Sequence, residues 1–177
     1  MHQFIKTKYQ PQDPAALANY IVKQANGITN MHLQQVMFIM QGYFLNQYHC
    51  HLIKGNFIRH PFGPIMPEVY NYYKKILHFD DGKSIIEPVI KHYYSIRGRN
   101  FSKPLMLNTK VLPNYGDFKK LVLNLIKTPE DKLVDLICSQ PFWKRDTIDK
   151  SLDTFMRNFA PDDPATCYLA YKNSKLK

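Results

Sequence analysis

The stretch RHPFGPIMPEVYNYYKK, residues 59–75, decides the fold of the first half of the chain. Three prolines and one glycine fall within the seven positions 61–67. Because each proline fixes its φ angle and lacks an N–H group, this segment cannot form regular helix or a central strand. Pro67 suits the first turn of a helix, where the missing N–H group has no partner to lose. We therefore expect a rigid corner from which a helix begins at Pro67, with Val69 and Tyr73 facing inward and Tyr70 on another side.

Two helices are expected before this corner. Asp13-Pro14 is typical of an N-cap and a first helical position, and Asn26-Gly27 is a pair that ends helices. A second helix is capped by Thr29 or Asn30. Its apolar residues recur at the spacing of one helical stripe, and they are Leu33, Val36, Met37, Met40 and Phe44.

The second half of the chain predicts three more helices. The first begins at Asp117 and ends near Lys127, and Thr128 caps the next. The third spans about 148–159, followed by a tail, 165–177, that is either partly ordered or docked on the domain. Residues 89–112 lack helical periodicity and favour a β-hairpin.

The fold class that these patterns predict is mainly α. We expect a single helical domain over residues 1–177, with about six helices and a small β-hairpin inserted near residues 89–112. The segments 1–12 and 165–177 are expected to be flexible or docking tails. Hydrophobic residues make up 45% of the chain, which is enough to fill a core for a domain of this size.

The charge and the cysteine content indicate what kind of partner and which cellular compartment to expect. The formal net charge is +10, and residues 61–120 carry ten lysines and arginines against five acids, which favours an anionic partner. Three widely spaced cysteines argue against a disulfide scaffold and for a reducing compartment. No apolar run is long enough to span a membrane, so we expect a cytoplasmic protein without a membrane partner.

Two stretches of sequence, one in the second expected helix and one at the corner, together resemble a known family. LQQVMFIMQGYFL at 33–45, followed by FGPIMPEVY at 62–70, is similar in order and spacing to the Panacea domain of SocA/GepA-like antitoxins. The resemblance covers about residues 14–78. The residues that carry it are Leu33, Gln34, Gln41, Gly42, Gly63, Pro64, Pro67, Val69 and Tyr70. The chain departs from the family in three places, where Gln35 replaces a lysine, Phe38 a tyrosine and Arg59-His60 an alanine-tryptophan pair.

The resemblance implies a protein-binding role without catalysis. Members of the family are described as antitoxins, each of which binds and neutralises a toxin encoded beside it. At least one member delivers its toxin to a protease as an adaptor, and many are found in prophages. For this chain the resemblance implies a cytoplasmic antitoxin, a toxin from an adjacent gene as partner, and no cofactor.

A basic and aromatic segment, residues 89–110, leaves other functions open. It carries no acidic residue and combines cations with rings that can stack on bases: Lys91, Arg97, Arg99, Lys103, Lys110, Tyr93, Tyr94 and Phe101. The same residues fit a solvated hairpin or a protein partner. The alternative functions are therefore a nucleic-acid-binding regulator and a phage accessory protein that binds a host target.

No pattern predicts a catalytic or a metal site. The His-Cys-His run at 49–51 lacks the further ligands of a zinc set, and the Asp80-Asp81 and Asp162-Asp163 pairs are typical of turns. Trp143 is either a core residue or, beside Lys144 and Arg145, an interface anchor. The candidate partner-binding residues are Arg59, His60, Phe62, Tyr70, Tyr93, Tyr94, Arg97, Arg99, Trp143, Lys144 and Arg145.

Overall fold

The structure is a computed structural model of the 177-residue chain. It describes residues 9–61, 63–76, 85–86, 105–143, 159–160, 162–174 and 176. Its helices are α2 (Pro14–Ala25), α3 (Asn30–Tyr48), α4 (Pro67–Ile76), α5 (Tyr115–Lys127), α6 (Glu130–Cys138) and α8 (Asp163–Asn173), with a 3-10 helix η1 (Thr109–Val111).

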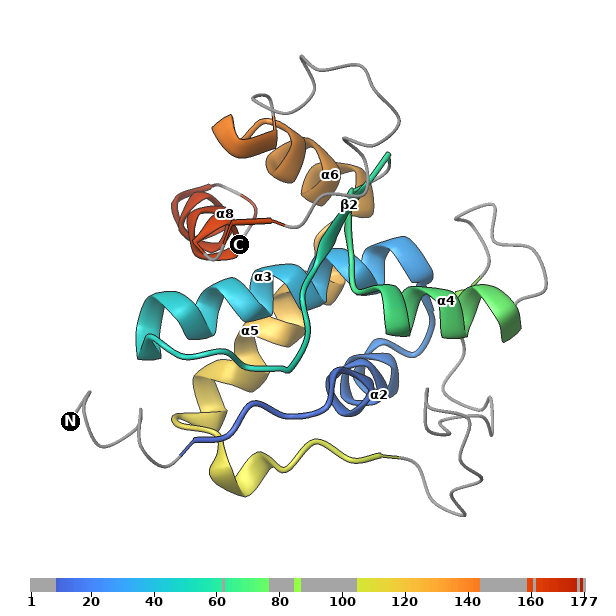
Figure 1. Ribbon diagram of the computed structural model, residues 1–177, viewed down its shortest axis with the longest axis vertical. Helices are drawn as coiled ribbons and strands as arrows, with labels where there is room; N and C mark the ends of the chain where they lie inside the picture. The colour runs from blue at the N-terminus through green and yellow to red at the C-terminus, as the bar shows by residue number, and fades with distance from the viewer. Residues whose placement is uncertain are drawn as a thin grey trace.

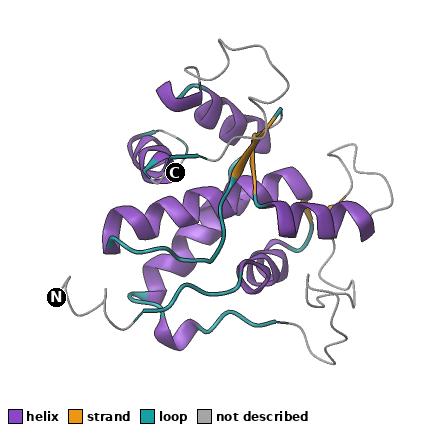
Figure 2. Cartoon of the chain, in the orientation of Figure 1, coloured by secondary structure: helices purple, strands orange, loops and turns teal. Residues whose placement is uncertain are grey.

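Two small antiparallel sheets accompany the helices. Strand β1 (Ile28–Thr29) pairs with β4 (Ile85–Ile86), and β2 (Ile58–His60) pairs with β3 (Gly63–Ile65). Figure 2 shows how little of the described part of the chain is strand. The predicted fold class, mainly α with a small hairpin, is confirmed.

Helix α3 lies at the centre of the molecule (Figure 1), between α6 and α8 on one side and α2 on the other. It contacts α2, α4, α5, α6 and α8. All of its residues from Asn30 to Phe44 except His32 are buried, so it has no solvated face over four turns. A helix that is covered all round is the core of a bundle. Each fully buried Leu, Met or Phe side chain along it stabilises the fold by about 1.5–3 kcal/mol.

The capping signals before the corner are confirmed. The Asp13 side chain accepts a hydrogen bond from the Ala15 N–H group at 2.9 Å, and Pro14 follows at the start of α2. Asn26 ends α2 in the left-handed conformation, with φ 51°. Of the two residues proposed to cap α3, Thr29 is the N-cap, because its hydroxyl accepts from the His32 N–H group at 3.0 Å.

The corner is a tight hairpin that leads into α4. Strands β2 and β3 pair through Arg59 opposite Pro64, which a two-stranded sheet tolerates because the proline needs only an open edge. Gly63 has φ 131°, a conformation that other residues rarely adopt. Helix α4 begins at Pro67, as the sequence predicts.

Tyr70 does not lie on the outer side of α4, so that prediction is wrong. Its side chain is 7% exposed and packs with Met31 and Ile65 in a small second cluster beside the main core. The hairpin that precedes α4 folds back and covers the face that the helical period assigned to solvent.

Three boundaries in the second half also differ from prediction. Helix α5 begins at Tyr115, capped by Asn114 in the left-handed conformation, rather than at Asp117. Thr128 does not cap α6, because its hydroxyl donates to the Asn124 carbonyl at 2.9 Å and so closes the end of α5. Residues 105–112 form coil and η1 instead of a hairpin strand, and the described hairpin lies at 58–65.

The chain ends treated as tails are packed where the structure describes them. The segment 163–173 is helix α8, which lies across α3 with Cys167, Tyr168 and Tyr171 buried. Near the other end, the Tyr9 hydroxyl donates to the Leu52 carbonyl at 2.8 Å. The rest of the predicted 89–112 hairpin, residues 89–104, and nearly all of the predicted 148–159 helix lie outside the described residues.

Candidate functional site

Gln34, a family-signature residue, joins α3 to the corner. Its side-chain oxygen accepts from the Met66 N–H group at 2.8 Å, and its amide group donates to the Asn30 side-chain oxygen at 3.2 Å. Asn30 in turn donates to the Tyr70 carbonyl at 3.1 Å. All three polar contacts are buried, so they fix the angle between α3 and α4.

Gln41 and Gly42 hold two other segments against α3. The Gln41 side-chain oxygen accepts from the N–H groups of Leu52 and Ile53, at 3.0 and 3.2 Å, and its amide nitrogen lies 2.5 Å from His51 Nδ1. At Gly42 a Cβ atom would lie 1.8 Å from the Pro164 carbonyl oxygen, so only glycine lets α8 approach this closely. The signature residues of α3 therefore shape the interior rather than a surface.

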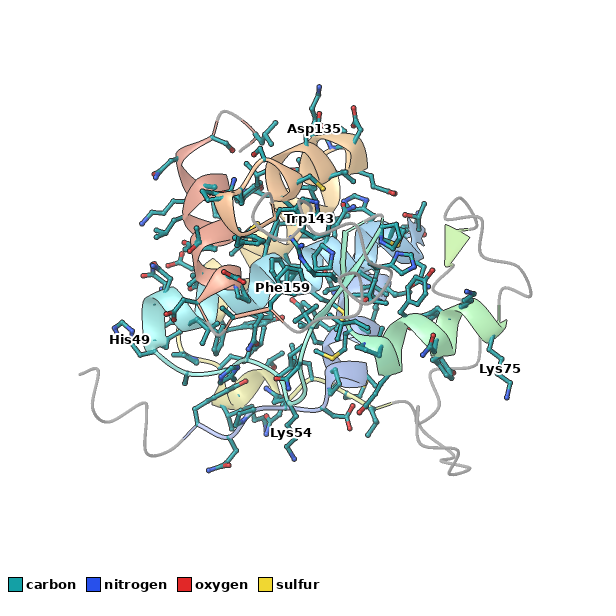
Figure 3. The ribbon with its side chains drawn as sticks, turned by 45° about the horizontal axis from the view of Figure 1, so that its top comes forward. His49, Lys54, Lys75, Asp135, Trp143 and Phe159 are labelled. Carbon is teal, nitrogen blue, oxygen red and sulfur yellow. The ribbon has the colours of Figure 1, made fainter. Side chains whose placement is uncertain are left out.

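Two of the candidate partner-binding residues, Arg59 and Trp143, lie together in the interior. The Arg59 guanidinium carbon is 4.4 Å from the centre of the Trp143 ring and 5.8 Å from that of Phe159. Arg59 also donates to the carbonyls of Phe142 and Trp143, at 3.1 and 2.7 Å. Trp143 and Phe159 sit side by side within the molecule in Figure 3. The Arg59 side chain is 4% exposed and that of Trp143 is 8% exposed. Trp143 is therefore a core residue in this structure.

The structure brings together few of the other candidates. His60 is half-buried with its ring 5.1 Å from that of Tyr70. The remaining candidates lie outside the described residues, and they are Phe62, Tyr93, Tyr94, Arg97, Arg99, Lys144 and Arg145.

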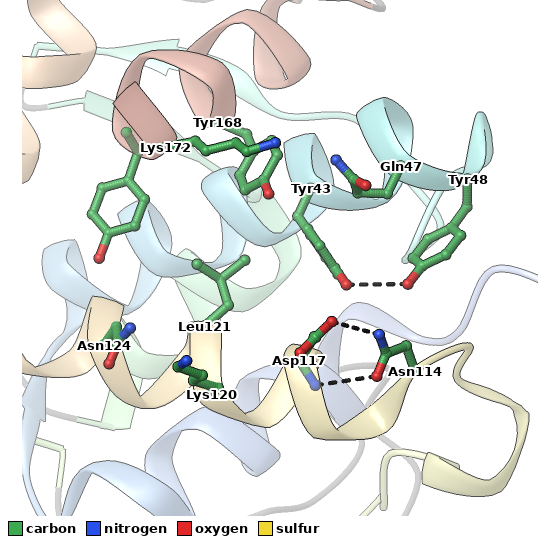
Figure 4. Close-up of a pocket in the computed structure, with 11 residues that line it drawn as sticks. Tyr43, Gln47, Tyr48, Asn114, Asp117, Lys120, Leu121, Asn124, Tyr168 and Lys172 are labelled. Atoms are coloured by element: carbon green, nitrogen blue, oxygen red, sulfur yellow. Dashed lines mark hydrogen bonds between the residues drawn. The ribbon is translucent and has the colours of Figure 1, made fainter. Parts of the chain in front are cut away.

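A groove of about 360 Å³ opens between α3, α5 and α8 (Figure 4), and the sequence reasoning did not identify it. This volume is in the range of small-ligand and peptide side-chain pockets. Its lining residues are Tyr43, Gln47 and Tyr48 of α3, Asn114, Asp117, Lys120, Leu121 and Asn124 at α5, and Tyr168, Tyr171 and Lys172 of α8.

One end of the groove is closed by internal hydrogen bonds. The hydroxyls of Tyr43 and Tyr48 lie 3.1 Å apart, and Tyr48 donates to the Pro113 carbonyl at 3.3 Å. Asn114 donates to the Asp117 carboxylate at 2.5 Å. Burial is the main cause that raises the pKa of the Tyr43 phenol, so this hydroxyl stays neutral and hydrogen-bonded.

The other end of the groove presents hydrogen-bond donors. Lys120 and Asn124 come from one face of α5, four residues apart, and Tyr168 and Lys172 come from one face of α8 at the same spacing. Burial raises the pKa of the Tyr168 phenol, which keeps its proton available for donation. Within the described residues, neither lysine has a carboxylate within ion-pair distance.

A signal for this groove exists in the sequence. Asp162-Asp163-Pro164 is a helix start, and Tyr168 and Tyr171 then follow at helical spacing. Because the Asp162-Asp163 pair is also typical of turns, the sequence predicts a tail at 165–177, and the third wall of the groove is not identified.

The described part of the chain contains no group of three or more His, Cys, Asp or Glu side chains that could hold a metal ion. None of its helices combines the length and the apolar character that a membrane crossing requires.

Comparisons with known proteins identify the family. A family model described as antitoxin SocA-like, Panacea domain, matches residues 33–144. Searches of curated proteins and of solved structures give no match. The matched range covers more than half of the 177 residues and includes α3 from Leu33 onward, the corner and α4, which carry the signature. The chain therefore belongs to the SocA-like antitoxin family of Panacea-domain proteins.

Proposed function

We propose that this protein is the antitoxin of a toxin–antitoxin pair and that it neutralises its toxin by direct binding, without a reaction of its own. The observation that carries the proposal is the family match over residues 33–144. The toxin is proposed to be the product of an adjacent gene, and the complex to form in the cytoplasm.

The architecture supports a binding role. Helix α3 is locked to the corner, to residues 52–53 and to α8 by buried contacts at the signature positions. A rigid framework of this kind loses little conformational entropy when it binds a partner, which favours a stable complex. The net charge of +10 adds long-range attraction toward an acidic protein face.

The mechanism that we propose is occlusion. The antitoxin covers the surface through which the toxin acts, so the toxin is inactive while bound and active again when released. Delivery of the toxin to a protease is a different mechanism with the same outcome for the cell. Occlusion leaves the amount of toxin unchanged, whereas delivery lowers it, so immunoblotting of the toxin distinguishes the two.

Co-expression with each adjacent gene tests the proposal. We expect one neighbouring product to stop growth when expressed alone, to be harmless when expressed with this protein, and to elute with it as one complex in size-exclusion chromatography. A neighbour that is as harmful with this protein as without it, and that elutes separately, would contradict the proposal.

A further inference from the structure

The open end of the α3–α5–α8 groove is a set of unused hydrogen-bond donors. The described structure gives the Tyr168 hydroxyl and the Asn124 side-chain amide no intramolecular partner. In Figure 4, Tyr168 and Lys172 project from α8 on one side of the groove and Lys120 and Asn124 from α5 on the other. Leu121 lies between them as an apolar floor. Donors on both walls of a groove fit a group that only accepts hydrogen bonds.

The charged side chains that line the groove also favour a negatively charged acceptor. Lys120 and Lys172 contribute two cations, and Asp117 contributes one anion that Asn114 already engages. Both lysine side chains are flexible, and a carboxylate between the two walls can accept charge-assisted hydrogen bonds from them, which is the stronger class of hydrogen bond in proteins.

We propose that this groove is the docking site for an acidic segment of the partner protein, with an Asp or Glu carboxylate held between Lys120 and Lys172 and by the Tyr168 hydroxyl. That the partner is a toxin rests on the proposed function, while the preference for a carboxylate rests on the groove alone. The apolar floor at Leu121 receives the methylene groups of the same side chain.

A peptide fits this groove better than a nucleic acid does. Asp117 also lines the groove and repels any anion that enters it. A phosphate backbone carries a charge at every nucleotide and meets this repulsion along its whole length, whereas a peptide segment with a single carboxylate meets it once. The phenol rings at the groove are held edge to face with one another, with Tyr43 and Tyr168 at 5.4 Å and 70°, so they are packed together rather than spread out as stacking platforms. A short segment with one or two carboxylates matches the volume and the position of the two lysines.

The test uses two groove variants and one control of the full-length protein. Lys120→Glu/Lys172→Glu reverses both charges, and Tyr168→Phe removes only the hydroxyl. The control is Lys132→Glu on α6, whose lysine side chain is 53% exposed and does not line the groove. Circular dichroism and thermal melting confirm that each variant is folded before binding is measured.

Binding is measured by calorimetry against the neighbouring toxin and by fluorescence anisotropy against a labelled oligoglutamate peptide. We expect the double variant to raise Kd for both by more than about tenfold, Tyr168→Phe to raise it by about three- to tenfold, and Lys132→Glu to leave it within about twofold. A folded double variant that binds both probes as the natural protein does would overturn the proposal.

The two probes separate this proposal from the proposed function. If no neighbouring product binds the natural protein, the antitoxin proposal fails and the oligoglutamate probe alone decides the groove. Oligoglutamate binding that is lost in the double variant supports the groove, and binding equal in both overturns it. An oligothymidylate strand that binds more tightly than oligoglutamate, and whose binding the double variant loses, would assign the groove to nucleic acid and also overturn it.

Discussion

Gln34 and Gln35 are neighbours on α3 and both are fully buried, yet they are in opposite states of hydrogen bonding. Gln34 uses its oxygen and its nitrogen, whereas the two polar atoms of Gln35 have no partner in the described structure. Gln35 is also the position at which the family usually has a lysine. Because its side chain is internal, this departure changes the packing beneath the corner and not a surface that a partner contacts.

The first prediction compares methionine at these two positions. A buried amide without a partner costs about 1–3 kcal/mol, so we expect Gln35→Met, which keeps the side-chain length, to raise the free energy of unfolding by about 1 kcal/mol. Gln34→Met removes the acceptor of the Met66 N–H group and the donor to the Asn30 side-chain oxygen, and it is expected to lower the free energy of unfolding by about 1–3 kcal/mol. Urea denaturation measures both. An equal decrease in the free energy of unfolding in the two variants would show that the Gln35 amide has hydrogen-bond partners.

The second prediction concerns His32, which the N-terminal turn of α3 holds against α5. Its Nε2 atom lies 3.1 Å from the Leu125 carbonyl, and Glu130 is close enough to favour the charged ring. Burial outweighs both contacts and lowers the pKa of His32 below its usual value of 6.5. The folded protein therefore binds this proton less readily than the unfolded chain does.

The sign of the pH effect follows from that shift. As pH falls through about 6.5, the unfolded chain takes up the proton first, so the free energy of unfolding decreases. We expect urea denaturation at about pH 7.5 and about pH 5.5 to show this loss. His32→Gln, which keeps a donor for the Leu125 carbonyl, reduces the difference between the two pH values. A difference of the same size in that variant would contradict the role of His32.

At the scale of elements, the contact between α3 and α8 decides whether the groove exists. The approach is set by Gly42, where a Cβ atom would lie 1.8 Å from the Pro164 carbonyl oxygen and 2.4 Å from the carbonyl carbon. Backbone atoms cannot move aside as a flexible side chain can. A larger residue at this position therefore separates the two helices.

The third prediction uses a matched pair of glycine substitutions. We expect Gly42→Ala to lower the free energy of unfolding by about 2–3 kcal/mol, because overpacking against backbone forces the helices apart. The control is Gly116→Ala in α5, where the nearest atom is 3.9 Å away and alanine is the better helix former. The control is expected to be neutral or slightly stabilising. Thermal melting measures both variants, and a change of 1 kcal/mol in the free energy of unfolding shifts the melting temperature by about 2–4 °C. Equal melting temperatures for the two variants would contradict the close contact at Gly42.

Elements were predicted from sequence where a local signal sets them. Asp13, Thr29 and Pro67 mark helix starts by side-chain and backbone chemistry that acts within one turn, and the structure confirms all three. The start of α5 was misplaced because Asn114 caps it from the left-handed conformation, which few residues adopt and which sequence periodicity does not reveal. The location of the hairpin was misplaced because β-compatible residues at 105–112 pack as coil against α2, where Asn19 donates to the Leu105 carbonyl.

At the scale of the whole molecule, the candidate site was not predictable from local pattern. The groove needs residues from α3, α5 and α8 together, and only tertiary packing brings Tyr43, Lys120 and Tyr168 to one place. Arg59 and Trp143 were proposed as partner contacts from their residue type. The structure instead stacks the guanidinium on the indole ring and pairs it with backbone carbonyls, which lets a cation lie in the interior. The residue types alone fit either outcome.

The net charge of +10 belongs to the molecule as a whole, and its effect on partner binding is a matter of rate. A cationic protein and an acidic partner attract each other over distances comparable to the Debye length, which is about 10 Å at 0.1 M salt and shortens as salt is added. Most of this long-range attraction is already present when the two proteins first meet, before their surfaces make close contacts. It therefore raises the association rate constant more than it lowers the dissociation rate constant.

The fourth prediction is the salt dependence of binding between this protein and its toxin. We expect the association rate constant, measured by stopped-flow fluorescence, to fall by about tenfold or more between about 50 mM and about 500 mM salt, while the dissociation rate constant changes by less than about threefold. Lys132→Glu lowers the net charge by two without touching the groove, so it reduces the association rate only modestly and leaves dissociation unchanged. Rates of association that stay constant across the salt series would show that the overall charge does not guide the two proteins together, and that contacts made after the encounter determine the affinity.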